Sequence, residues 1–252
     1  MMREKKISQE KNKAVKQKEQ AAEGFASLSD ILSALDALEV SLGYEARPAD
    51  EFKQAEPLDG LMLILLSQNT NDRNRDIAFA NLKKQYPRWD QVAALEAGQI
   101  ESLIRIAGLG KTKSERMKQI LDLIHAEFGV YSIDAMLQWE PQRARDFLGA
   151  LPGIGPKTVA CVLVFDLGMP AFPVDTHVDR LSHKLGWVPK KMSPEKTQVY
   201  LEGILPPDRF RGAHLNLIEH GRQVCHARKP ACGDCCIRSL CLWLKEQEAL
   251  QA

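Results

Sequence analysis

The amino-acid sequence predicts an all-α protein, because apolar residues recur at helical spacing along most of the chain. From Leu28 onward, successive apolar positions are three and four residues apart, which places them on one face of a helix. Alternation with a period of two residues, the pattern of a half-buried strand, is hard to find anywhere. With 252 residues, 44% of them hydrophobic, the chain can bury the core of one or two domains.

The predicted helices begin after Ser29 and Asp30, which can cap a first helix with apolar positions from Ile31 to Leu42. Residues 58–67 are almost wholly apolar and predict a buried central helix, and a third helix over 72–84 stops before a proline. Further helices are predicted at 90–96, 98–105, 112–128, 133–138, 141–149, 156–167, 175–185, 194–203 and 208–223.

The net charge of +1 does not indicate a nucleic-acid binder by itself. Residues 1–24 hold seven Lys or Arg and four Glu, a net of +3, which leaves about −2 for the rest. We expect residues 1–24 to form a disordered or fraying helical tail, or else a basic arm that contacts phosphates. The sequence contains no stretch of about 18 apolar residues that could span a membrane. We therefore expect a cytoplasmic, nucleoid-associated monomer without membrane contact.

Residues 143–167 are predicted to form a helix, a tight hairpin and a second helix. Gly153 and Gly155 permit positive φ and the close approach of another chain, and Ile154 between them can anchor the hairpin or contact a sugar. Pro156 suits the first position of the second helix, whose free N–H groups would face a phosphate. A similar pattern, apolar-x-Gly-apolar-Gly, occurs at 106–110.

Lys157 lies in the first turn of that second helix, where the helix dipole disfavours a positive charge and so favours a neutral amine. A neutral amine is the nucleophile that forms a Schiff base with a sugar carbon. Asp175 follows 18 residues later and can cap the helix that starts near Thr176. Its carboxylate can also stabilise positive charge that develops on a deoxyribose.

Five of the six cysteines lie within residues 225–241, which indicates metal ligation rather than a disulfide framework. Four of them follow the spacing Cys225-x6-Cys232-x2-Cys235-x5-Cys241, and this single compact run favours a [4Fe–4S] cluster over zinc. We expect Cys236 to take no part. The enclosed loop carries Arg228 and Lys229, which we expect to contact phosphates.

These motifs together resemble the helix-hairpin-helix DNA glycosylases, and endonuclease III in particular, over roughly residues 28–245. The resemblance implies a six-helix barrel domain at 50–170 and an iron–sulfur domain from 25–49 plus 171–245. It also implies that double-stranded DNA with a lesion or abasic site binds between the domains, with the target nucleotide rotated out. The resemblance assigns the Schiff base to Lys157, the aspartate motif to Asp175 and the cluster to the four cysteines.

The resemblance further implies that Gln68, Asn69 and Leu109 fill the space that the rotated nucleotide leaves. The sequence Ser67-Gln68-Asn69-Thr70-Asn71-Asp72 departs from the family pattern, so either Gln68 or Asn69 remains a candidate for this role. Residues 171–176 and 185–189 look more like the plant 5-methylcytosine glycosylases.

Three functions remain open from the sequence. The first is a bifunctional glycosylase and AP lyase of base excision repair that acts on oxidised pyrimidines. The second is a glycosylase for mispaired or methylated pyrimidines, and the third is a noncatalytic cluster-bearing DNA-binding protein. The presence of both Lys157 and Asp175 argues against the third, because a binding protein needs neither.

Overall fold

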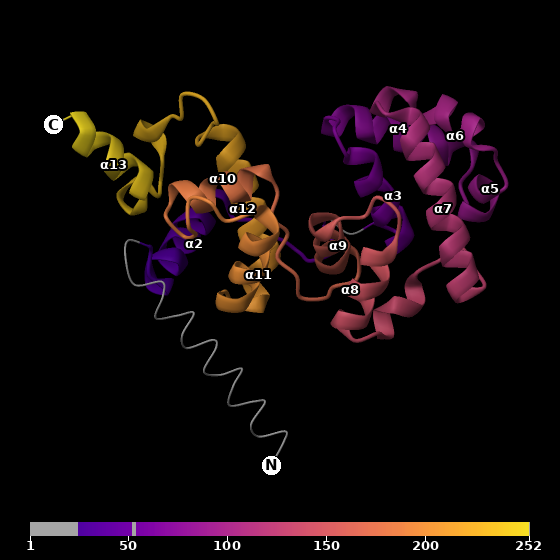
Figure 1. The fold of residues 1–252 in the computed structure, drawn as a ribbon, viewed down its shortest axis with the longest axis horizontal. Coiled ribbons are helices and arrows are strands. Elements are labelled where there is room, and N and C mark those ends of the chain that lie inside the picture. The colour runs from indigo at the N-terminus through magenta and orange to yellow at the C-terminus, as the bar shows by residue number, and fades with distance from the viewer. Residues whose placement is uncertain (1–24, 52–53, 252) are drawn as a thin grey trace, which may run out of the picture. The chain divides into compact units, whose positions relative to one another are not determined.

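The computed structural model describes residues 25–51 and 54–251, and the chain divides into two compact units. The hairpin unit contains residues 45–173 and 205–214, and the cysteine unit contains the described residues of 25–44, 174–204 and 215–251. The predicted all-α fold is confirmed, since every regular element of the described residues is helical (Figure 1). The tail expected at residues 1–24 lies outside the described residues.

The hairpin unit holds a run of helices joined by short connections. In chain order these are α3 (Pro57–Ser67), α4 (Asp72–Gln85), α5 (Trp89–Ala93), α6 (Ala97–Ile104), the 3-10 turn η1 (Arg105–Ala107), α7 (Gly110–Phe128), the 3-10 helix η2 (Asp134–Gln138), α8 (Pro141–Ala150), α9 (Pro156–Cys161) and η3 (Val162–Asp166). The expected helix at 156–167 changes character at Val162, where it widens into a π-helical turn closed by Leu167 N–H donating to Val162 O at 3.0 Å.

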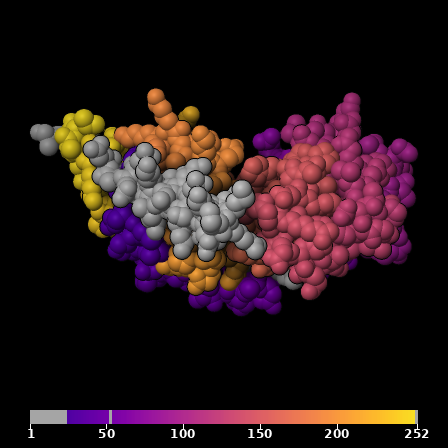
Figure 2. All heavy atoms as spheres, turned by 60° about the horizontal axis from the view of Figure 1, so that its bottom comes forward, coloured from indigo at the N-terminus to yellow at the C-terminus, as the bar shows by residue number. Residues whose placement is uncertain are grey.

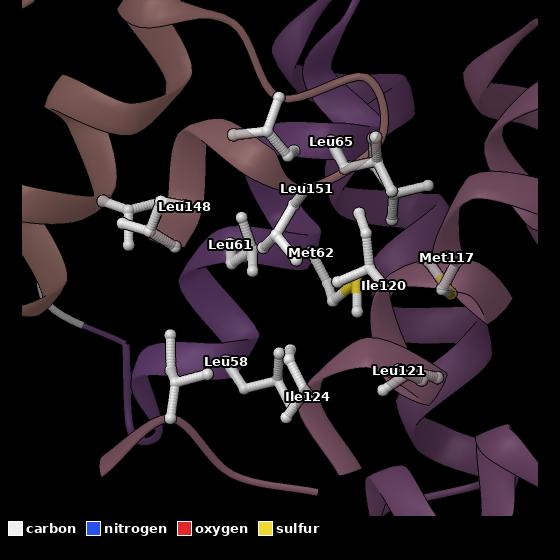
Figure 3. Close-up of a cluster of buried hydrophobic side chains, with 14 of the residues drawn as sticks. Leu58, Leu61, Met62, Leu65, Met117, Ile120, Leu121, Ile124, Leu148 and Leu151 are labelled. Atoms are coloured by element: carbon white, nitrogen blue, oxygen red, sulfur yellow. The ribbon is translucent and has the colours of Figure 1, made fainter. Parts of the chain in front are cut away.

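The core of the hairpin unit is built around α3, which contacts α4, α7 and α9. Leu61, Met62, Leu65 and Leu66 are fully buried, as the apolar run in the sequence predicts. Figure 3 shows Leu61 and Met62 among side chains from α7 and α8, with Ile120 and Leu151 nearby. Burial of this apolar surface, at about 25 cal/mol per Å² removed from water, is the main force that holds the helices together.

Residues 205–214 belong to the hairpin unit, whereas the division expected from the sequence assigned them to the iron–sulfur domain. Two interactions explain this difference. The Arg209 guanidinium donates two hydrogen bonds of 3.0 Å to the Glu45 carboxylate, and the Phe210 ring packs 5.7 Å from the Phe172 ring. The segment includes η4 (Pro207–Arg209) and the first turn of α12 (Phe210–Gln223).

The cysteine unit contains α2 (Leu28–Leu42), α10 (Thr176–Lys184), α11 (Pro194–Ile204), the rest of α12, the 3-10 turns η5 (Cys232–Asp234) and η6 (Arg238–Leu240), and α13 (Leu242–Gln251). The sequence analysis did not predict α13. This helix lies at the surface (Figure 2) and buries only part of its apolar side chains. Such a helix needs only a weak periodic apolar pattern, which is why the sequence did not predict it.

The cap of α2 differs from the expected one, because Ser27 occupies the N-cap position rather than Ser29 or Asp30. The Ser27 hydroxyl accepts from Asp30 N–H at 3.1 Å, and the Asp30 carboxylate accepts from Ser27 N–H at 3.1 Å. This reciprocal capping box moves the helix start upstream, since Asp30 serves as its third residue.

No helix of the described residues is long and apolar enough to cross a membrane.

Candidate functional site

The hairpin between α8 and α9 has its tightest point at Gly153. This residue has φ +76°, and a Cβ there would lie 2.6 Å from the Cδ and Nε atoms of Arg116. The left-handed backbone therefore favours glycine at this position, and a larger residue would also have to displace the Arg116 side chain. The hairpin places Gly153, Gly155 and Pro156 at the surface.

Two expectations for this hairpin are refined by the structure. Gly155 has φ −91°, a conformation open to any residue, so it does not supply the expected positive φ. A Cβ at Gly155 would meet no atom within 4 Å, which means that the absent side chain leaves open surface. Ile154 is 6% exposed and joins the core, so of its two expected roles the structure favours the anchor over contact with a sugar.

Lys157 lies in the first turn of α9 and is half-buried. The helix ladder begins with Val159 N–H donating to Gly155 O at 3.0 Å. The backbone N–H groups that precede Val159 in this turn lie ahead of that ladder and carry the positive end of the peptide dipoles. Lys157 thus belongs to a turn whose N–H donors suit an anion.

The side chain of Gln68 is held against the same hairpin. Its Nε2 donates to Gly153 O at 2.9 Å, and its Oε1 accepts from Arg116 NH1 at 3.3 Å. Gln68 ends α3, and the next residue, Asn69, is exposed with φ +54°. Of the two candidates for filling a vacated base position, Gln68 is therefore engaged within the protein and Asn69 projects from it.

Leu109 stands at the tip of the first glycine hairpin with φ +51° and is 56% exposed. A leucine with this exposure and a left-handed backbone is uncommon, and such strain concentrates at functional sites. Lys113, four residues further on, is 1% exposed, and its Nζ donates to Leu66 O at 2.7 Å and Ala107 O at 2.8 Å. Burial lowers the pKa of the Lys113 amine.

In the cysteine unit, Asp175 is the N-cap of α10, as the sequence predicts. Its Oδ1 accepts hydrogen bonds from His177 N–H at 2.9 Å and Val178 N–H at 2.8 Å. Both capping bonds use the same oxygen, so Oδ2 takes no part in the cap. The carboxylate is thereby fixed in orientation and is half-buried.

The four cysteines of the predicted cluster motif line one cavity of the cysteine unit. Cys225, Cys232, Cys235 and Cys241 share this cavity with apolar side chains and with Lys184 and His220. Cys236 is exposed and does not line this cavity, although it shares a second surface hollow with Cys235. In the described part of the chain, no group of three or more His, Cys, Asp or Glu residues could hold a single metal ion.

Burial and charge set the acidity of these thiols. Burial raises the pKa of Cys225 and Cys241 and raises that of Cys235 to about 11. The positive charges of Lys184 and Arg180 act in the opposite direction on Cys225. Arg180 also donates to Cys225 O at 2.8 Å, which ties α10 to the start of the cysteine motif.

The loop between the first two cysteines is closed at its base by Ala231 N–H donating to Val224 O at 2.9 Å. Arg228 and Lys229 are both exposed on this loop, and Lys229 has φ +52°. The loop thus presents two adjacent positive side chains from an anchored turn, and the phosphate contacts expected of them stay a prediction.

The fold and these features define a class of protein: an all-α protein that carries a helix-hairpin-helix element and a separate four-cysteine motif. The model of the HhH-GPD superfamily of base excision DNA repair proteins matches residues 62–207, more than half of the chain. The chain belongs to this superfamily, and its relatives identify it as an endonuclease III-like DNA glycosylase.

Curated relatives support this assignment. A provisionally named DNA glycosylase of Arabidopsis thaliana is 36% identical over 78% of this chain and 67% of its own length. Endonuclease III of Thermotoga maritima is 32% identical over 75% of this chain and 84% of its own length. Rice protein ROS1C is 29% identical over 61% of this chain but only 9% of its own length, in line with the plant resemblance.

Solved structures show the same fold. A trapped covalent intermediate of endonuclease III with DNA superposes with a TM-score of 0.76 at 26% identity. The similarity covers 88% of this chain and 99% of that one.

Sequence reasoning missed three residues that organise the site: Arg116, Lys113 as a buried donor, and His220. The Nε2 atom of His220 lies 3.4 Å from Cys235 Sγ, and burial lowers the pKa of this imidazole. Arg116 and Lys113 lie on a predicted helix, but only their contacts with distant loops distinguish them from other helical cations. No sequence pattern could have marked these contacts.

The two hairpin glycines allow a matched test. Gly153→Ala should lower the free energy of unfolding by at least about 1–2 kcal/mol, because alanine is strained at positive φ and meets Arg116. Gly155→Ala should leave thermal stability unchanged and weaken binding to duplex DNA, since its Cβ would occupy the open surface. Thermal melting and fluorescence anisotropy would measure the two effects. Equal melting temperatures for both variants would contradict this account of the hairpin.

Proposed function

We propose that this chain is a bifunctional DNA glycosylase and AP lyase that excises oxidised pyrimidines and then cleaves the strand by β-elimination. The observation that carries the proposal is the family match over residues 62–207, which contains both the hairpin lysine and the capping aspartate. A DNA-binding protein without catalysis would not need this lysine, and its aspartate would serve only as a cap. Solved relatives in complex with DNA support duplex DNA as the partner.

In the proposed reaction, the Lys157 amine attacks C1′ of the target deoxyribose and the glycosidic bond breaks, with its electron pair leaving on the base. The nitrogen then forms a Schiff base with C1′ as the sugar ring opens. Loss of a proton from C2′ expels the 3′ phosphate and cleaves the strand. The position of Lys157 in the first turn of α9 supports this role, because the N–H groups of that turn suit a phosphate of the DNA backbone.

Asp175 supplies the negative charge in this scheme. As the base departs, positive charge grows on the deoxyribose, and a fixed carboxylate stabilises it without needing to reorganise. The two hydrogen bonds to Asp175 Oδ1 support the role, since they fix the group and leave Oδ2 outside the cap. Capping and catalysis are therefore compatible functions of one side chain.

Borohydride reduction tests the lysine. The wild-type protein incubated with abasic-site duplex should give a covalent protein–DNA adduct, and Lys157→Ala should abolish it while duplex binding persists. Lys111→Ala removes an exposed lysine of the first glycine hairpin and should trap normally. Full trapping by the Lys157 variant would refute the assignment.

Substitution of Asp175 separates its two functions. Asp175→Asn retains a capping oxygen, so stability should change little, while the excision rate should fall roughly 10²–10⁴-fold. Asp175→Ala should lose the same activity and also about 1 kcal/mol of stability, the usual effect of removing a cap. Single-turnover excision and thermal melting would distinguish them. A near-native rate for the asparagine variant would leave Asp175 as a cap alone.

We further propose that Cys225, Cys232, Cys235 and Cys241 bind a [4Fe–4S] cluster. The residues fit this group, because four thiols share one cavity and no other cysteine of the motif enters it. Lys184 and Arg180 offset the negative charge of thiolate ligands. The bound cluster would supply structural cross-linking, since four thiolates complete its ligand set. Binding of the cluster would fix the loop that carries Arg228 and Lys229, so that both side chains can contact phosphates.

Metal analysis of anaerobically prepared protein tests the ligand set. We expect about four irons per chain and a brown protein. Cys232→Ser should lose iron, and Cys236→Ser, the matched control, should keep it because that side chain lies outside the cavity. One zinc per chain without iron, or loss of iron from the Cys236 variant, would contradict the proposal.

The preferred base is a separate question, and duplexes with single defined lesions answer it. Excision of oxidised pyrimidines is the expected result. Selective excision of mispaired or methylated pyrimidines would instead favour the second function, toward which residues 171–176 and 185–189 point.

A further inference from the structure

A buried lysine of the hairpin unit joins the two loops that carry Asn69 and Leu109. Lys113 lies on α7 and is 1% exposed, yet its amine keeps two hydrogen bonds, to Leu66 O and Ala107 O. A buried ammonium is expensive unless it is hydrogen-bonded, so a lysine at this position is held there by specific partners. The chemistry proposed for Lys157 does not use it.

Both acceptors lie at the ends of helical segments. Leu66 is in the last turn of α3, and Ala107 ends the 3-10 turn η1. Such terminal carbonyls have no intrahelical donor and carry the negative end of the peptide dipoles, so a cation suits them. One amine thus satisfies two helix ends that are 41 residues apart in the sequence.

Each acceptor lies two or three residues before an exposed residue with a strained backbone. Asn69 and Leu109 have φ of +54° and +51°, and they are the non-glycine residues of the described hairpin unit with positive φ. Residues in this conformation persist only where the surrounding structure holds them there. The Lys113 amine donates to Leu66 O, three residues before Asn69, and to Ala107 O, two residues before Leu109.

We propose that Lys113 is a positioning residue that holds the Asn69 and Leu109 loops in fixed register, so that both enter the DNA duplex together when the target nucleotide rotates out. The proposal rests on the glycosylase function proposed above. Two side chains that fill one gap must keep their separation, and misplacement by about 1 Å can reduce a rate about 10²-fold. A single rigid amine between the loops meets that requirement.

The simpler interpretation is that Lys113 only stabilises the fold, and the same helix offers a matched control. Lys118 also lies on α7, and its Nζ donates to two backbone carbonyls, Ala93 O at 2.9 Å and Leu95 O at 2.6 Å. Ala93 ends α5 and Leu95 lies in the connection to α6, so neither carbonyl belongs to the segment of Asn69 or of Leu109. Loss of either amine leaves two carbonyls without this donor. Only the loss of the Lys113 amine changes how the Asn69 and Leu109 loops are held relative to each other.

The experiment compares Lys113→Met with Lys118→Met in the full chain. 2-Aminopurine beside an oxidised pyrimidine reports loss of base stacking by its fluorescence, and single-turnover excision is measured on the same duplex. Duplex affinity, melting temperature and borohydride trapping at an abasic site are measured in parallel. Lys113→Gln, which keeps a neutral donor on a shorter chain, replaces Lys113→Met if the latter fails to fold.

We expect both variants to melt lower than the wild type. Only the Lys113 variant should lose the fluorescence rise and about 10²-fold in excision rate. It should keep duplex affinity and trapping at an abasic site, where no base has to be extruded.

If the Lys113 and Lys118 variants match each other in fluorescence and excision, the positioning role is wrong and Lys113 is a structural donor. That outcome leaves the glycosylase function intact, because the wild type still excises. If the wild type itself neither unstacks nor excises any lesion, both proposals are wrong.

Discussion

The C-terminal end of α3 lies where the chain leaves a dry core and turns toward its surface loops. Leu65 and Leu66 are fully buried there, so the carbonyls of this last turn need donors that water cannot supply. Lys113 provides one from α7. The need for a donor at these buried carbonyls affects the rest of the hairpin unit, because the segment after α3 carries two surface contacts. These are the contact of Gln68 with the second hairpin and the exposed Asn69.

The hairpin unit therefore connects its three surface loops through a few polar side chains. Lys113 joins the α3 end to the first glycine hairpin, and Gln68 with Arg116 joins it to the second at Gly153. Three of these four bonds end on backbone carbonyls, and the fourth joins the Arg116 guanidinium to the Gln68 side chain, so the bonds mainly hold the geometry of the loops. Such a scaffold suits a protein that must present several contacts to one rigid duplex.

The cysteine unit follows a different principle, in which charge is balanced around a buried polar site. Four thiols line a cavity that also holds Lys184 and His220, and burial raises the pKa of Cys225, Cys235 and Cys241. Arg180 and Lys184 from α10 bring positive charge to the same region, and α10 is also the helix that Asp175 caps. One short helix thus orients the aspartate at its start and supports the cysteine motif along its length.

The sequence by itself determined the helical class, the buried run of α3 and the capping position of Asp175. These features depend on local spacing and on residues near in the chain, which periodicity and capping rules describe. The start of α2 and the π-helical turn at Val162 were less predictable. Alternative N-cap residues, and alternative helical hydrogen-bond patterns, differ little in energy.

Only the tertiary structure decided which unit holds residues 205–214, that Ile154 is an anchor, and that Gln68 rather than Asn69 is engaged within the protein. It also decided that Lys113 is buried between two helix ends, although its sequence neighbours resemble those of Lys157. Each of these outcomes depends on a partner at least 40 residues away in the chain or on burial by several helices. Local pattern carries no information about such partners, because the contact forms only when the core brings the segments together.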